Sequence, residues 1–135
     1  FARITRILDD IPDATTRCGT ILSLLLGFAE KNPGLARVLG GDVLTGETAR
    51  LRQRVHQLFE RLETQLKQVL REAELREGQR TSITASAAAN LLIAQAEGRI
   101  SQYVRSDFKR LPTEYWEDQW TLLSGQLFRN ASQPA

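Results

Sequence analysis

Apolar side chains recur three and four positions apart along almost the whole chain, and no stretch of useful length alternates apolar with polar residues. Such spacing places the apolar residues on one face of an α-helix, whereas alternation would indicate a β-strand. The pattern therefore predicts an all-α fold. Its clearest case is the stretch 47–77, where one stripe steps by three and four: Leu51, Val55, Leu58, Leu62, Leu66, Val69 and Ala73.

Breaks in this pattern divide the chain into five or six helices. Residues 1–8 are expected to be the end of one helix, followed by a break at 9–13 whose acids suit helix capping and whose proline cannot sit inside a helix. A helix at 14–31 is apolar nearly all round, which predicts that other helices surround it. Asn32 is expected to cap a short helix that has Pro33 at its first position.

The second half of the chain predicts two more helices. A polar loop at 78–82 separates the long helix from one expected at 83–108, with Thr81 or Ser82 as the N-cap. Thr113 is the expected N-cap of a last helix. Residues 130–135 are expected to form a frayed tail.

Size and composition indicate a single domain of ordinary character. The 135 residues suit one compact domain, and the apolar share of 41% and charged share of 25% are typical of globular proteins. A net charge of +2 does not suggest that this segment by itself binds nucleic acid. The longest apolar stretch, 21–28, falls well short of the roughly 20 residues that cross a bilayer. The chain contains no methionine, so we expect it to be a fragment of a longer protein.

Few side chains are available for catalysis or metal binding. His56 and Cys18 are the only histidine and cysteine, which leaves little for a nucleophilic triad, a metal cluster or a disulfide. We expect His56 to be solvated and Cys18 to be a small core residue, with a reactive thiol as the alternative. We therefore expect no enzyme activity, no metal and no cofactor, and a reducing compartment such as the cytoplasm.

The last two predicted helices suggest a homodimer. The helix at 83–108 is rich in small residues, which let another backbone approach closely, and the following helix carries a face of tryptophan and leucine. Two copies of such a hairpin can form a four-helix bundle across a two-fold axis. The alternative is that the same chain covers this surface. The predicted interface comprises Ala87, Leu91, Ala94, Gly98, Trp116, Trp120 and Leu123.

The order of these elements resembles the C-terminal, regulatory and dimerising region of the TetR family. Within that family, three segments resemble the branch of nucleoid occlusion factors, namely 24–39, 57–72 and 99–113. The segments occur in the same order with near-equal spacing, and the resemblance covers essentially the whole chain. It departs from the pattern at 41–50 and 74–88.

The resemblance implies that residues 1–135 form one TetR-type C-terminal domain. An N-terminal helix-turn-helix domain would precede it, and residues 1–8 would end the helix that links the two. It further implies a dimer in the cytoplasm, associated with the nucleoid. Such a dimer binds specific DNA sites through the missing domain, binds the C-terminal tail of FtsZ and inhibits assembly of the Z-ring. The positions that match the FtsZ groove are Arg3, Leu24, Gly27, Lys31 and Asn32.

The residues themselves agree with such a groove without requiring it. Leu24, Gly27 and Lys31 are spaced by three and four, so they line one stripe of a helix. Glycine inside a helix costs about 1 kcal/mol against alanine, so Gly27 suggests that another backbone approaches closely. That backbone could equally belong to the same chain. Lysine at position 31 replaces the family's arginine and loses its planar fork.

A second function remains open within the same family, namely that of a transcriptional repressor released by a small ligand. It would require an apolar cavity inside one subunit, lined by the leucine-rich helix and the long helix, with a few convergent polar groups.

Overall fold

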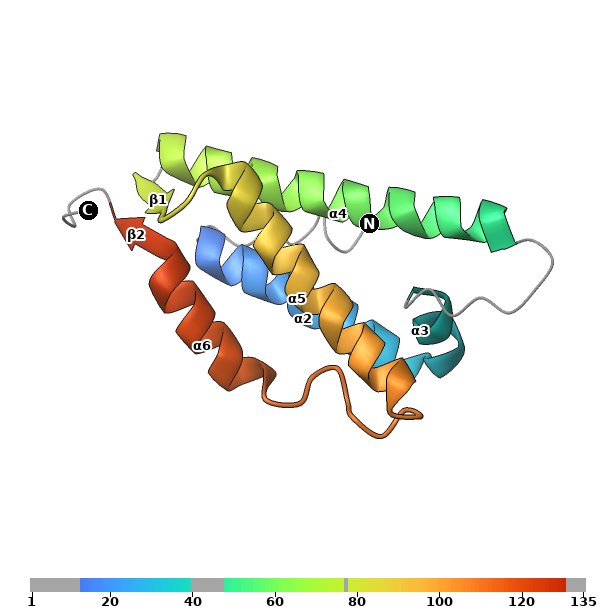
Figure 1. Ribbon diagram of the computed structural model, residues 1–135. Helices are drawn as coiled ribbons and strands as arrows, with labels where there is room; N and C mark the ends of the chain where they lie inside the picture. Colours follow the sequence, from blue (N-terminus) through green and yellow to red (C-terminus); the bar gives the residue numbers. More distant parts are fainter. Residues whose placement is uncertain (1–12, 40–47, 77, 131–135) are drawn as a thin grey trace.

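The computed structural model describes residues 13–39, 48–76 and 78–130. Within these ranges the chain forms five helices and two three-residue strands (Figure 1), which confirms the predicted all-α class. The expected helix end at 1–8 and residues 131–135 of the expected tail lie outside the described residues. So does Gly40–Gly41, where the sequence predicts that the short helix after Asn32 ends. The elements are α2 (Ala14–Lys31), α3 (Pro33–Leu39), α4 (Thr48–Arg76), β1 (Gln79–Thr81), α5 (Ala85–Arg105), α6 (Trp116–Leu127) and β2 (Phe128–Asn130).

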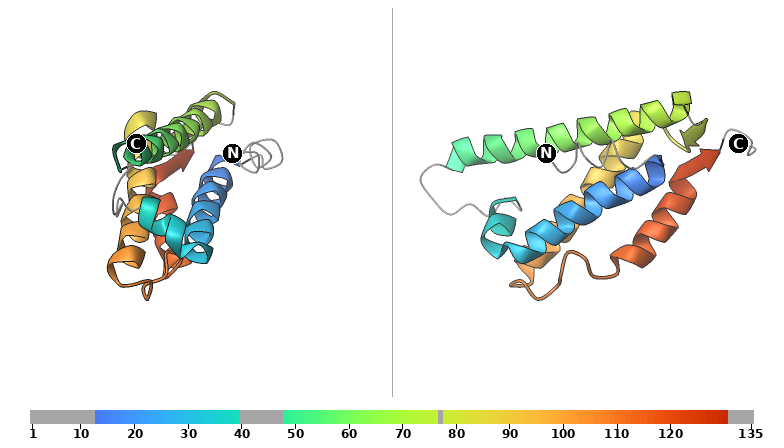
Figure 2. Two further views of the ribbon diagram at one scale, coloured as in Figure 1. Left: turned by 90° about the vertical axis from the view of Figure 1, so that its right-hand side faces the viewer. Right: turned by 180° about the vertical axis from the view of Figure 1, so that it is seen from behind.

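Helix α5 lies at the centre of the arrangement and packs against α4, α2 and α3. It passes in front of α2 in Figure 1 and behind α2 in the reverse view of Figure 2, so the outer sides of these two helices face in opposite directions. Burying each large apolar side chain of the core contributes about 1.5–3 kcal/mol. The fully buried leucines and isoleucines are Ile21, Leu22, Leu26, Leu66, Leu92 and Ile100.

Helix α2 has the predicted bounds, and local hydrogen bonds fix both of its ends. Asp13 is the N-cap, because its carboxylate accepts from the Thr16 backbone N–H at 3.0 Å. At the other end the Asn32 side-chain amide donates to the Phe28 carbonyl at 2.8 Å. The side chain of Asn32 therefore closes α2. Its backbone carbonyl accepts from the Ala36 backbone N–H at 2.9 Å, so the residue also precedes α3 at the predicted cap position. Pro33 does occupy the first position of α3.

The boundaries of α5 and α6 differ from the prediction. Thr84, and neither Thr81 nor Ser82, caps α5 by accepting from the Ala87 backbone N–H at 3.1 Å. Tyr115 occupies the N-cap position of α6 in the left-handed region, with φ of 60° and no side-chain cap. The hydroxyl of Thr113, the predicted cap, donates instead to the Glu30 carboxylate.

The polar loop after α4 pairs with residues 128–130 as a small antiparallel sheet, and Asn130 of that strand belongs to the expected tail. Gln79 lies opposite Asn130, and Thr81 opposite Phe128. The Ser82 backbone N–H also donates to the Leu127 carbonyl at 2.7 Å. These contacts attach the C-terminal end of α6 to the connection between α4 and α5.

Candidate functional site

The outer side of α2 presents apolar and basic residues together. Phe28 is 55% exposed, Leu24 and Gly27 are half-buried, and Lys31 is exposed. Lys31 also lies in the last turn of the helix, where a cation interacts favourably with the helix dipole. We call Leu24, Gly27, Phe28 and Lys31 the α2 face. It combines apolar contact area with a positive charge at one end.

Gly27 has open space beside it. A methyl group built at its Cα would meet no atom of the described residues within 4 Å. Packing of this glycine against another helix of the same chain is therefore not seen in the described part of the protein. Gly19, in the same helix, has no such space. A methyl group built at its Cα would lie 2.5 Å from Nε1 of Trp120.

The remaining predicted groove residues have different positions. Asn32 is exposed beside the α2 face, with its amide bound to the backbone of α2. Arg3 lies outside the described residues. The structure thus brings Leu24, Gly27, Lys31 and Asn32 together at one end of α2, and Phe28 is an addition that the sequence did not single out.

Helix α5 presents a second uncovered surface. Ala87, Ala94 and Gly98 are exposed and Leu91 is half-buried, and a methyl group at Gly98 would also meet no described atom within 4 Å. These four residues form one stripe on the side of α5 that the described part of the chain leaves open. We call them the α5 face.

The tryptophans of α6 lie toward their own chain. Trp116 is 7% exposed, and its ring stacks on that of Trp120 with centroids 5.6 Å apart. Trp120 packs on Gly19 of α2, and Leu123 is half-buried against the same core. Trp116 of the predicted interface is therefore buried within one chain, and Trp120 is half-buried. The outward side of α6 carries Leu122, which is 70% exposed.

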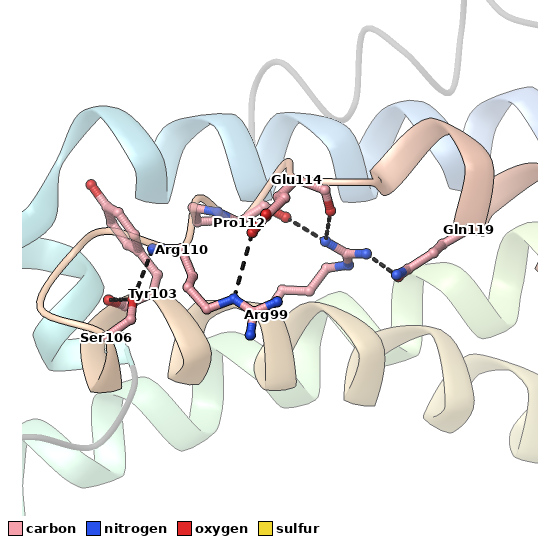
Figure 3. A network of polar contacts seen from close by, with 7 residues as sticks. All are labelled: Arg99, Tyr103, Ser106, Arg110, Pro112, Glu114 and Gln119. Carbon is pink, nitrogen blue, oxygen red and sulfur yellow. Dashed lines mark hydrogen bonds and ion pairs between the residues drawn. The ribbon is translucent and has the colours of Figure 1, made fainter.

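A buried arginine between α5 and α6 is a feature that the sequence reasoning missed. Arg99 is 8% exposed, and its Nη1 donates to the Pro112 and Glu114 carbonyls at 2.8 and 2.7 Å (Figure 3). Its Nη2 donates to the Gln119 side-chain oxygen, and its guanidinium lies 5.3 Å from the ring centroid of Trp116. Burial lowers the pKa of this guanidinium, and the charge of Glu114 acts against that shift.

Cys18 is fully buried, as predicted, and burial raises the pKa of its thiol to about 12. The charge of Asp13 contributes to this rise in the pKa, and that of Arg17 opposes it. The thiolate is the reactive form of cysteine, so the reactive-thiol alternative finds no support in this geometry.

Hollows of moderate size lie at the surface of the described residues. One of about 430 Å³ lies between Ser23 and the start of α6, and one of about 250 Å³ lies between α5 and α6 beside Arg99. Both are lined largely by polar side chains, in contrast to the apolar cavity that a ligand-released repressor requires. Among the described residues no group of three metal-ligating side chains could hold a metal ion, and no helix is long and apolar enough to span a membrane.

Comparison with known proteins gives a consistent result. Residues 12–128 match the SlmA-like family, described as the tetracyclin repressor-like C-terminal domain. The chain is 54% identical over 130 residues to the nucleoid occlusion factor SlmA of Shewanella amazonensis, and 52% identical to those of Shewanella denitrificans and Shewanella halifaxensis. Each match covers 96% of this chain and 66% of the relative, so the chain spans about two thirds of the length of these relatives.

Proposed function

The chain belongs to the SlmA-like family of tetracyclin repressor-like C-terminal domains, and we propose that it is the FtsZ-binding and dimerising part of a nucleoid occlusion factor. The full protein would bind specific chromosomal sites through an N-terminal helix-turn-helix and inhibit Z-ring assembly there. The observation that carries this proposal is the α2 face, which combines apolar surface, a glycine with open space beside it and a cation. Three of its residues, Leu24, Gly27 and Lys31, are positions that the resemblance assigns to an FtsZ groove.

The chemistry of the α2 face suits a short acidic peptide with apolar side chains. Leu24 and Phe28 offer apolar area, and Gly27 leaves room for a peptide backbone to approach between them. Lys31 lies at the end of this surface, where it would attract a carboxylate of the peptide and raise the rate of association. Because that attraction is between exposed charges, binding should weaken as salt is added.

The α5 face supplies the surface for a second copy. Its exposed residues are small, so two such helices could cross closely, and Leu122 of α6 adds an exposed apolar side chain to the same hairpin. A dimer would present two α2 faces, one on each copy. Binding of the full protein to DNA would then bring several such faces together.

The test is titration of a fluorescent FtsZ C-terminal tail peptide with the full-length protein, followed by anisotropy, with and without specific DNA. We expect Leu24→Glu to weaken peptide binding by at least about tenfold, since it buries a charge within the apolar contact. Lys31→Asp should also weaken binding, most strongly at low salt.

Matched controls make the same chemical changes elsewhere. Leu75 on α4 is 86% exposed, and Lys109 is exposed after α5. Leu75→Glu and Lys109→Asp should leave peptide affinity unchanged. Equal affinity of all four variants and the parent would remove the α2 face as the binding site, and absence of binding by the parent would remove the proposed partner.

A further inference from the structure

We propose that Arg99 is a positioning residue that joins the α2 face to the α5–α6 side of the molecule, so that the geometry of the last turn of α2 depends on it. The proposal deepens the proposed function, on which its consequence for FtsZ binding rests. Its structural part concerns only the contacts among α2, α5, α6 and the segment 106–115, and can be tested without FtsZ.

The first step is that Arg99 binds the segment before α6 through hydrogen bonds. From its place on α5 the guanidinium binds two backbone carbonyls, those of Pro112 and Glu114, and the side chain of Gln119 in α6 (Figure 3). Thr113, which lies between the two bound carbonyls, is thereby fixed in place. The same cation lies over the Trp116 ring, which adds a further contact with the start of α6.

The second step connects Thr113 to α2. Its hydroxyl donates to the Glu30 carboxylate, with oxygen–oxygen distances of 3.1 and 3.3 Å. The Tyr103 hydroxyl of α5 donates to the Glu30 backbone carbonyl at 2.8 Å. The last carbonyls of a helix lack partners within the helix, so Tyr103 and Asn32 together satisfy carbonyls at the end of α2. Glu30 directly precedes Lys31 of the α2 face.

The third step is that the segment 106–115 needs external support. Three of its non-glycine residues, Asp107, Phe108 and Tyr115, adopt left-handed backbone conformations with φ between 57° and 65°. Each such residue is unfavourable and persists where the surrounding structure imposes it. Tyr115 precedes α6 without forming a side-chain cap. The contacts of Arg99 are therefore a principal restraint on where α6 begins.

The fourth step is that arginine suits this position and lysine does not. A guanidinium presents several donors in a rigid plane, which allows it to bind three acceptors on different residues at once. A lysine ammonium keeps the charge but reaches these acceptors from a single atom. Because Arg99 is almost fully buried, acceptors that it releases would be left without a donor or would take up water.

The experiment compares hydrogen exchange of the full-length protein with that of Arg99→Lys, using Arg105→Lys as the matched control. Arg105 is an exposed arginine on the same helix. We expect Arg99→Lys to speed amide exchange both at 109–115 and at 27–32, while Arg105→Lys changes neither. Faster exchange at 109–115 with unchanged exchange at 27–32 would overturn the proposal.

A second variant covers the case in which Arg99→Lys loosens the whole fold. Tyr103→Phe combined with Thr113→Val keeps Arg99 and both side-chain shapes, and removes the two hydrogen bonds to Glu30. Exchange should then rise at 27–32, and unchanged exchange there would also overturn the proposal.

Peptide titration links the result to function. Arg99→Lys should lower affinity for the FtsZ-tail peptide by about three- to tenfold without altering any residue of the α2 face, and unchanged affinity would contradict that consequence. If the parent protein binds no FtsZ tail, the proposed function fails, whereas the exchange measurements still decide the role of Arg99.

Discussion

Cys18 shows how burial sets the chemistry of a single side chain. Cys18 belongs to α2, and its thiol is enclosed in the core. Chiefly through burial, its pKa is raised from the ordinary value of 9.0 to about 12. Between these two values the unfolded chain loses the thiol proton and the folded chain keeps it. Ionisation then favours the unfolded chain, so the free energy of unfolding should fall as the pH rises from 9 toward 12.

This dependence can be measured against Cys18→Ala, which keeps every other titrating group. From pH 8 to pH 10 the parent should lose about 1 kcal/mol more stability than the variant, as measured by urea unfolding at each pH. In the folded protein at pH 8, the thiol should also resist alkylation. Identical pH slopes for the two proteins would show that the thiol is not buried as described.

At the scale of single residues, the sequence predicted the burial of apolar side chains more readily than the contacts of polar ones. The leucine stripe of 47–77 and the burial of Cys18 follow from local spacing and size. Arg99 could not be recognised, because its acceptors lie 13 to 20 residues further along the chain, partly in a segment without periodic pattern. The burial of Trp116 within its own chain could not be predicted for a similar reason, since it depends on how α6 turns back onto the chain.

Helix α2 carries two glycines with opposite surroundings, and these allow a prediction at the scale of one element. Gly19→Ala should destabilise the protein by about 1–3 kcal/mol, because the new methyl group would overlap the indole of Trp120. Gly27→Ala should stabilise it by about 1 kcal/mol, because alanine favours the helix and the space there is open.

Urea unfolding followed by circular dichroism measures both changes, each variant serving as the control for the other. Gly27→Ala should also weaken FtsZ-tail binding despite its greater stability, because the methyl group occupies space on the α2 face. Equal stabilisation by both substitutions would contradict the packing of Trp120 on Gly19.

The positions of the helices were predictable because the residues that begin and end a helix lie next to it in the sequence. The bounds of α2 follow from Asp13 at one end and Asn32–Pro33 at the other. The two strands were missed because a stretch of three residues is too short to show an alternating pattern. Each strand also depends on pairing between residues 79–81 and 128–130, which are far apart in the sequence. The cap of α6 was misplaced, since Thr113 binds Glu30 of a different helix.

At the scale of the whole molecule, helices α2 and α5 lie on opposite sides of the fold, because α5 passes in front of α2 in Figure 1 and behind it in the reverse view of Figure 2. The α2 face and the α5 face each consist of residues that their helix leaves exposed or half-buried. One surface can therefore meet a second copy while the other remains open to a peptide. The segment 106–115 connects both sides through Arg99 and Glu30. The stripe that forms the α2 face was predictable from the sequence. Its position relative to the α5 face depends on how the two helices pack, which local spacing does not predict.

The claim on which this arrangement depends is that two copies meet through the α5 face. Sedimentation equilibrium of the chain at micromolar concentration tests it, together with Ala94→Arg and, as control, Ala49→Arg at an exposed alanine of α4. The parent and Ala49→Arg should sediment at about twice 15.2 kDa, and Ala94→Arg should sediment at 15.2 kDa while remaining helical. A parent that sediments at 15.2 kDa, or an Ala94→Arg variant that remains dimeric, would contradict the account.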